Sequence, residues 1–156
     1  MEVEWLIMGD FAQVVDNKLY VQGGGWDRLT VNSGFPVEHR VGIAASFTVP
    51  WNETNQLAGV EIEVLTDDGA SVAKIEGQFK VGRPADHPPG QDQRTQVAGN
   101  LTLKLEKAGT YAIEARIDGQ VGKRTQFNVV PGPILAMRQQ QERQQPGAAD
   151  EQGPDG

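Results

Sequence analysis

The stretch from Lys107 to Val130 carries the clearest alternation of apolar and polar positions in the chain. One set of alternate positions holds Tyr111, Ile113, Ala115 and Ile117. Between them lie Ala112, Glu114 and Arg116. A period of two is typical of a strand with one face in a core and one face in water. Asp118-Gly119 interrupts the alternation with a strong turn signal, and the pattern then resumes through Phe127 and Val129. The stretch therefore predicts a β-hairpin.

The same alternation recurs along the chain and predicts about nine strands. Besides the two strands of the hairpin they cover residues 3–8, 19–22, 26–31, 37–49, 60–64, 73–79 and 97–105. Turn signals separate these runs at the spacing of a β-sandwich. Glu61 or Glu63 is expected to face Lys74 across the hairpin that turns at Asp67-Asp68-Gly69. We therefore expect an all-β domain over residues 1–130, folded as a single antiparallel β-sandwich.

Two aromatic positions refine this prediction. Trp5 alternates with polar residues in the first strand, on the same face as Val3 and Ile7, and we expect it in the core. Tyr111 begins its strand directly after a turn, where immunoglobulin-like sandwiches use a tyrosine to tie the strand corner to nearby backbone. A tyrosine that is only half-buried on a strand would fit this position equally well. The architecture expected is immunoglobulin-like, without the cysteine pair of antibody domains.

Two segments depart from the strand pattern. Residues 82–96 contain three prolines and no apolar period, which predicts a long exposed loop that crosses from one sheet to the other. After Pro131-Gly132-Pro133 the composition changes, and residues 134–145 are good helix formers with a proline placed for the first turn. We expect residues 131–156 to form a flexible tail. Either a short helix at 134–145 docks on the sandwich or on a partner, or the segment frays, and residues 146–156 should be disordered.

Composition and charge narrow the classes of partner. The chain has 156 residues and a net charge of -7, which disfavours nucleic acid and anionic membranes as partners. It has no cysteine, so disulfides, thiolate metal sites and cysteine catalysis are excluded. The first ten residues carry acids where a signal peptide needs a basic region, and no apolar run is long enough for a transmembrane helix. We expect a cytoplasmic protein.

No motif in the chain marks a catalytic, cofactor or metal site. The two histidines, His39 and His87, lie in no ligand-spaced pattern, and the serines have no nucleophile signature around them. The glycine run at residues 23–25 lacks the Lys-Ser/Thr pair of a phosphate loop, so a kink or bulge is expected there. We therefore predict no catalytic residue, cofactor or metal, although an enzyme whose site assembles only in space stays open.

The N-terminal half resembles a known family. It combines Asp10, Asp16-Asn17-Lys18-Leu19, the segment from Gly23 to Trp26, Phe35-Pro36 and Asp68-Gly69. This arrangement is similar to an uncharacterised bacterial family known only as a domain of unknown function, in which glycine is expected at the position of Asn17. The resemblance covers about residues 1–130 and implies a compact β domain of a bacterial cytoplasm. It implies no activity and no catalytic residues.

The remaining hypothesis is a contact surface made by loops. Trp51 follows Pro50 in a polar loop, and an exposed aromatic in such a place is a usual contact anchor, or else a plug over the end of the core. We expect it to act with Asn52, Glu53, Thr54 and Asn55 of its own loop and with the long loop from Arg83 to Gln93, which includes His87. Trp26, which follows the glycine run, is expected as a further neighbour. The function expected is a binding or scaffold module for an unidentified protein partner. The alternatives are an enzyme with an unmarked site and a small-ligand or carbohydrate binder that uses loop tryptophans.

Overall fold

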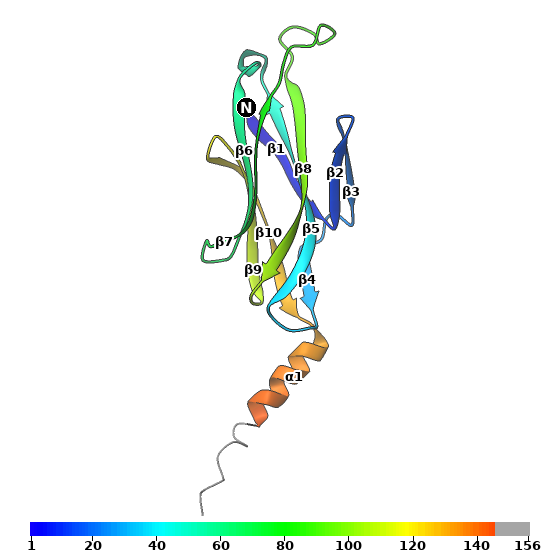
Figure 1. Cartoon of the computed structure of the whole chain (residues 1–156), viewed down its shortest axis with the longest axis vertical. Coiled ribbons are helices and arrows are strands. Elements are labelled where there is room, and N and C mark those ends of the chain that lie inside the picture. The colour runs from blue at the N-terminus through cyan, green and yellow to red at the C-terminus, as the bar shows by residue number, and fades with distance from the viewer. Residues whose placement is uncertain (146–156) are drawn as a thin grey trace, which may run out of the picture.

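The computed structural model describes residues 1–145, which form ten strands, a 3-10 turn and one helix (Figure 1). The elements are β1 (Glu2–Gly9), β2 (Phe11–Val15), β3 (Lys18–Gln22), β4 (Arg28–Val31), β5 (Val37–Val49), η1 (Trp51–Glu53), β6 (Leu57–Leu65), β7 (Ser71–Lys80), β8 (Gln93–Leu105), β9 (Gly109–Ile117), β10 (Gln120–Pro131) and α1 (Pro133–Gln144). The strand that the sequence pattern missed is β2. It has five residues and follows β1 after a single residue, so its alternation is too short to stand apart.

The strands form three sheets, and the prediction of a single antiparallel sandwich is wrong in two respects. One sheet has the order β1-β5-β8 and another has the order β4-β10-β9-β6-β7, while β2 and β3 form a separate two-stranded sheet. The five-stranded sheet is mixed, because β4 runs parallel to β10. It is also curled into a half-barrel. Val3 of β1 lies so close over Gly122 of β10 that a side chain at Gly122 would collide with it.

The core lies between the three-stranded and five-stranded sheets. Both sheets contribute fully buried side chains, the largest being Phe47, Phe127, Ile43, Ile62, Leu103, Leu105 and Ile113. Burying one such side chain contributes about 1.5–3 kcal/mol relative to leaving it exposed. The alternation in the hairpin of β9 and β10 is confirmed on its inner face, where Tyr111, Ile113 and Ala115 are buried.

Tyr111 is buried and fastened to the turn before β9. Its hydroxyl donates a hydrogen bond to the backbone carbonyl of Lys107 at 2.8 Å. Its ring stacks on Phe127 of β10 with the ring centres 5.5 Å apart. The expected bond from the tyrosine to nearby upstream backbone is therefore confirmed.

The first strand does not keep one face in the core, so the prediction for Trp5 is wrong. The register of β1 on β5 shifts between Val3 and Trp5. Such a bulge moves the following residues to the opposite face of the sheet. Val3 is buried before the bulge, and Leu6 and Met8 contact the core after it, while Trp5 lies half-buried on the other face.

The outer face of the five-stranded sheet is less exposed than its polar sequence predicts. Glu114 in β9 is only 8% exposed. It forms ion pairs with Arg116 of its own strand and with Arg124 of β10. Arg116 also donates to Glu63 of β6 at 2.6 Å. Charged side chains therefore lie along the sheet and cover one another.

The expected pair across the hairpin of β6 and β7 is confirmed. The ammonium nitrogen of Lys74 lies 3.6 Å from a carboxylate oxygen of Glu61. In the ladder Lys74 stands directly opposite Glu63, and Glu61 stands opposite Glu76. Lys74 therefore forms ion pairs with carboxylates on both strands, Glu61 of β6 and Glu76 of β7.

The sheet of β2 and β3 packs over the outer face of β5 and β8. Asn100 of β8 binds the backbone of Ala12 twice, accepting from its amide at 3.1 Å and donating to its carbonyl at 2.9 Å. Gly42, paired with Asn100 in the ladder, leaves room for the backbone of Phe11 and Ala12. The side-chain amide of Asn100 and the absence of a side chain at Gly42 thus hold the β2–β3 hairpin against β5 and β8.

The two ends of the domain differ. The helix α1 leaves one end, and η1 and the connection between β7 and β8 lie at the other (Figure 1). That connection runs over residues 81–92, because β8 begins at Gln93 rather than at the expected Val97. It does cross between sheets as predicted. Within residues 1–145 no helix is long and apolar enough to span a membrane. The expected disorder of residues 146–156 lies outside the described residues.

Candidate functional site

Two connections that are far apart in sequence meet at the loop end of the domain, opposite α1. The loop from Trp51 to Gln56 joins β5 to β6, and residues 81–92 join β7 to β8. The backbone amide of Asn55 donates to the carbonyl of Val81 at 2.7 Å. This loop-to-loop bond brings the sequence-predicted residues of both segments onto one surface.

Arg83 is the residue that holds the two loops together. Its Nε donates to the hydroxyl of Thr54 at 2.6 Å, and one terminal nitrogen donates to the carbonyl of Trp51 at 3.0 Å. The guanidinium carbon lies 4.4 Å from the centre of the Trp51 ring. A cation over an indole ring is attractive by about 0.5–1 kcal/mol at an exposed site. Arg83 itself remains exposed, so its other N–H groups face solvent.

His87 also lies against Trp51. The two ring centres are 6.3 Å apart and the planes differ by 17°. Nε2 of His87 lies 3.1 Å from the carbonyl oxygen of Gln91, which fixes the ring within its own loop. Trp51 is half-buried between these neighbours. We call Trp51, Thr54, Arg83 and His87 the tryptophan platform.

The asparagines and Trp26 have different relations to this platform. Asn52 and Asn55 are exposed on the β5–β6 loop beside it, and Asn55 adopts a left-handed conformation with φ of 60°. Trp26 lies elsewhere, with its ring edge-on to Phe127 and His39 and its Nε1 donating to Asp10 at 3.2 Å. His39 stands near the start of β5 and Trp51 just beyond its end, and the strand from His39 to Val49 alone spans roughly 33 Å at the usual rise. Trp26 therefore fills an edge of the core.

The platform combines a guanidinium, an indole, an imidazole and a hydroxyl, with amide side chains nearby. The two histidines lie near opposite ends of β5, and residues 1–145 hold no group of three acidic or histidine side chains placed for a metal ion. The Thr54 hydroxyl is buried and donates to the carbonyl of Trp51 at 2.8 Å. What the platform presents outward is guanidinium N–H groups beside an aromatic edge, with amide side chains nearby.

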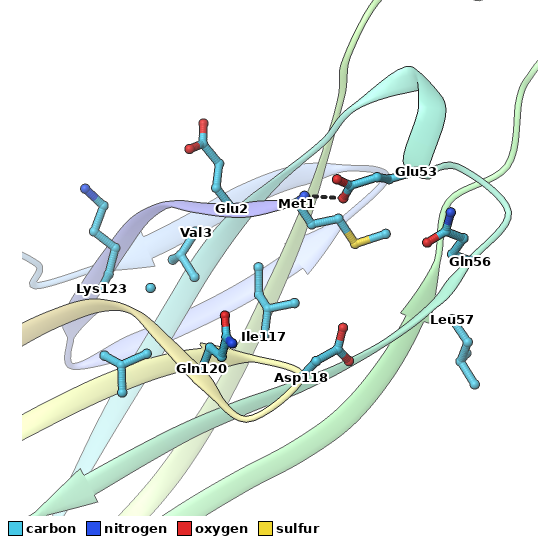
Figure 2. A pocket seen from close by; sticks show the side chains of 12 residues that line it. Met1, Glu2, Val3, Glu53, Gln56, Leu57, Ile117, Asp118, Gln120 and Lys123 are labelled. Atoms are coloured by element: carbon cyan, nitrogen blue, oxygen red, sulfur yellow. Dashed lines mark hydrogen bonds and ion pairs between the residues drawn. The ribbon is translucent and has the colours of Figure 1, made fainter.

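A polar hollow of about 500 Å³ lies on the same half of the domain (Figure 2). Glu53 and Gln56 come from the β5–β6 loop, Asp118 comes from the β9–β10 turn, and Met1 lies between them. The amine of Met1 forms an ion pair with Glu53, and Asp118 accepts the backbone amide of Gly59 at 2.8 Å. The carboxylates of Glu53 and Asp118 thus each bind a partner that holds this end of the domain in place.

Two residues of the loop end were not predicted from sequence. Leu57 and Val121 flank the hollow and are 63% and 52% exposed. Both had the pattern of ordinary apolar residues, and only their exposure in the fold singles them out. Thr54, by contrast, lies in the loop stretch that the sequence favoured as a contact, and it joins Arg83 to Trp51.

The comparisons place the chain in a family. No curated protein matches it. A family model described as a family of unknown function, DUF6941, matches residues 4–130, which are nearly all of the β domain and exclude α1. The chain therefore belongs to the family of unknown function DUF6941.

Proposed function

We propose that this protein is a binding module without catalysis, acting in a bacterial cytoplasm, and that it contacts a protein partner through the tryptophan platform. The observation that carries the proposal is the ordered stack of Arg83 on Trp51 across two loops. Tryptophan and arginine are the residues most enriched among those that dominate binding energy. A contact that is already ordered loses less side-chain entropy when a partner binds.

The proposal includes an immunoglobulin-like architecture, which the strand order supports. The neighbours β10-β9-β6-β7 correspond to strands G, F, C and C′ of a variable-type domain, and β1-β5-β8 correspond to A, B and E. Tyr111 then stands at the start of strand F, where such domains carry their corner tyrosine. In this correspondence the β5–β6 loop is the B–C loop, one of the loops with which variable domains bind.

The carbohydrate alternative has less support. Sugar binding by aromatic stacking needs an open ring face. The Trp51 ring is covered by Arg83 and approached by His87, and Trp26 is packed against Phe127. An aromatic that is flanked in this way suits a protein interface, where apolar area and directional donors act together.

The test compares capture of partners by matched variants. Each protein is immobilised and exposed to lysate of the source organism: the wild type, Trp51→Ala and Arg83→Ala. The proteins retained by each are then quantified by mass spectrometry. Tyr20→Ala is the control, because Tyr20 is 53% exposed on β3, away from the platform. We expect a specific partner to bind wild type and control alike and to be lost from both platform variants, since truncating an anchor costs about 2 kcal/mol or more of binding.

Thermal melting of each variant separates lost contact from lost fold. If partner binding per folded molecule is the same in Trp51→Ala as in wild type, Trp51 only caps the core and the proposal fails. If the wild-type protein converts a compound in a metabolite mixture into a product, that result supports the enzyme alternative instead.

A further inference from the structure

The strand β7 lies at an edge of the five-stranded sheet and is incompletely covered. Within residues 1–145 it pairs with β6 on one side and with no strand on the other. None of its ten residues is buried, although Ile75 and Phe79 face the core and contact it. The neighbouring strands β6 and β9 each bury three or more apolar side chains on that face. A sheet edge of this length that no strand of the described residues covers is a template for pairing with another strand.

The space beside β7 is also open. An apolar cavity of about 110 Å³ lies between Ile75, Phe79 and Val97. At Gly77 a side chain would meet no atom within 4 Å. Ile75 therefore contacts β8 at Gly99 and also lines this cavity. Burial of this half-exposed apolar surface would be favourable.

The charges on the outer face of β7 are complementary to those of a second β7 that runs in the opposite direction. Glu76 stands directly opposite Glu61 in the ladder, an unfavourable like-charge pair that Lys74 moderates by contacting both. Arg116 also lies 3.8 Å from Glu61, so Lys74 is the cation that contacts Glu76. Lys74 and Glu76 flank Ile75 symmetrically, one residue on either side. An antiparallel copy of β7 centred on Ile75 would therefore bring a lysine opposite each Glu76.

We infer that β7 is the dimerisation strand of this protein, pairing antiparallel with β7 of a second copy about Ile75. Lys74 of each copy then stands opposite Glu76 of the other, and the two five-stranded sheets join into one. This arrangement is a closed two-fold contact, in which the same surface serves both copies. It lies on the sheet edge rather than on the tryptophan platform, so it stands independently of the proposed binding function.

Charge reversal tests the pairing. Sedimentation of wild type over a range of concentrations should show a reversible dimer. Glu76→Lys places lysine opposite lysine at both symmetric positions and should weaken the dimer on the order of tenfold or more. The double variant Lys74→Glu with Glu76→Lys restores opposite charges across the two-fold axis and should recover the wild-type affinity. A wild type that is monomeric at every concentration, or a dimer insensitive to the single reversal, overturns the inference.

A single cysteine tests the register in a chain that contains none. Ile75→Cys puts the two sulfurs opposite each other on the axis and should form a disulfide-linked dimer under mild oxidation. Gln78→Cys on the same strand is the control, because it would lie about 20 Å from its symmetric copy. Thermal melts establish that both variants fold. Equal cross-linking of the two variants, or none from folded Ile75→Cys, contradicts the proposed register.

Discussion

Single side chains fasten the strand ends of this domain. Tyr111 closes the corner before β9, Asn100 seats the β2–β3 hairpin, and Arg83 joins the two loops at the loop end. In each case one side chain forms hydrogen bonds with backbone groups that are not paired between neighbouring strands. Such groups would lose hydrogen bonds when buried, so these side chains contribute more than their own contact area.

Tyr111→Phe tests this role at one atom. The change removes the hydroxyl that donates to Lys107 and leaves the ring stacked on Phe127. We expect the free energy of unfolding, measured by urea denaturation, to fall by about 1 kcal/mol. The control is Tyr20→Phe, since Tyr20 is exposed and should lose almost nothing. Equal losses in both variants would show that the corner bond has no special weight.

At the scale of elements, the outer face of the five-stranded sheet is held by a chain of ion pairs. The Ser71 hydroxyl and the Arg116 guanidinium beside Glu63 hold the pKa of that carboxyl below its ordinary value of 4.5. A lowered pKa means that the folded state favours the charged form. The resulting stability is fully present above the ordinary pKa and is lost as pH falls through the lowered pKa of the folded state.

Glu63→Gln should therefore remove part of the acid sensitivity. At neutral pH the variant should be less stable than wild type by about 1 kcal/mol, because a charge-assisted bond becomes a neutral one. The difference should shrink once pH falls below 4.5, where the unfolded wild-type chain begins to protonate Glu63, and should continue to shrink through the lowered pKa of the folded state. Chemical denaturation at a series of pH values measures this. Glu106→Gln is the matched control, because its ion pair with Lys104 is exposed and should contribute little. A gap that persists unchanged in acid would contradict the linkage.

The whole molecule consists of a β domain and a helix that leaves it at one end (Figure 1). Leu135 is the buried residue of α1, at 8% exposure, whereas Ile134 and Met137 are exposed. Burial of one leucine contributes about 1.5–3 kcal/mol. The family match also ends at residue 130, before the helix. The β domain should thus fold without α1.

Removal of residues 133–156 tests this boundary. The truncated chain keeps β10 and the bond from the Gly132 amide to the Val31 carbonyl. We expect it to unfold cooperatively, with a loss of about 2 kcal/mol that reflects Leu135. Leu135→Ala in the full chain is the comparison and should lose a similar amount. A truncated chain without a cooperative thermal transition would show that the helix is part of the folding unit.

The sequence by itself determined where most strands and turns lie. For the C-terminal segment it left a short helix at 134–145 and a frayed tail as alternatives, and the structure shows the helix within one residue of those bounds. These features follow from local rules. A period of two marks a strand, and Asp118-Gly119 supplies the positive φ values that its turn requires. The residues of the tryptophan platform were also named from loop composition, but their proximity was not derivable, because 32 positions separate Trp51 from Arg83.

The tertiary structure decided which strands pair and which faces are covered. The bulge after Val3 turned Trp5 out of the core, and Arg116 and Arg124 covered Glu114 on a face patterned for water. The parallel pairing of β4 with β10 joins segments about a hundred residues apart. Burial and pairing depend on which neighbours long-range folding supplies. The pattern of apolar and polar residues reports only the alternation along one strand.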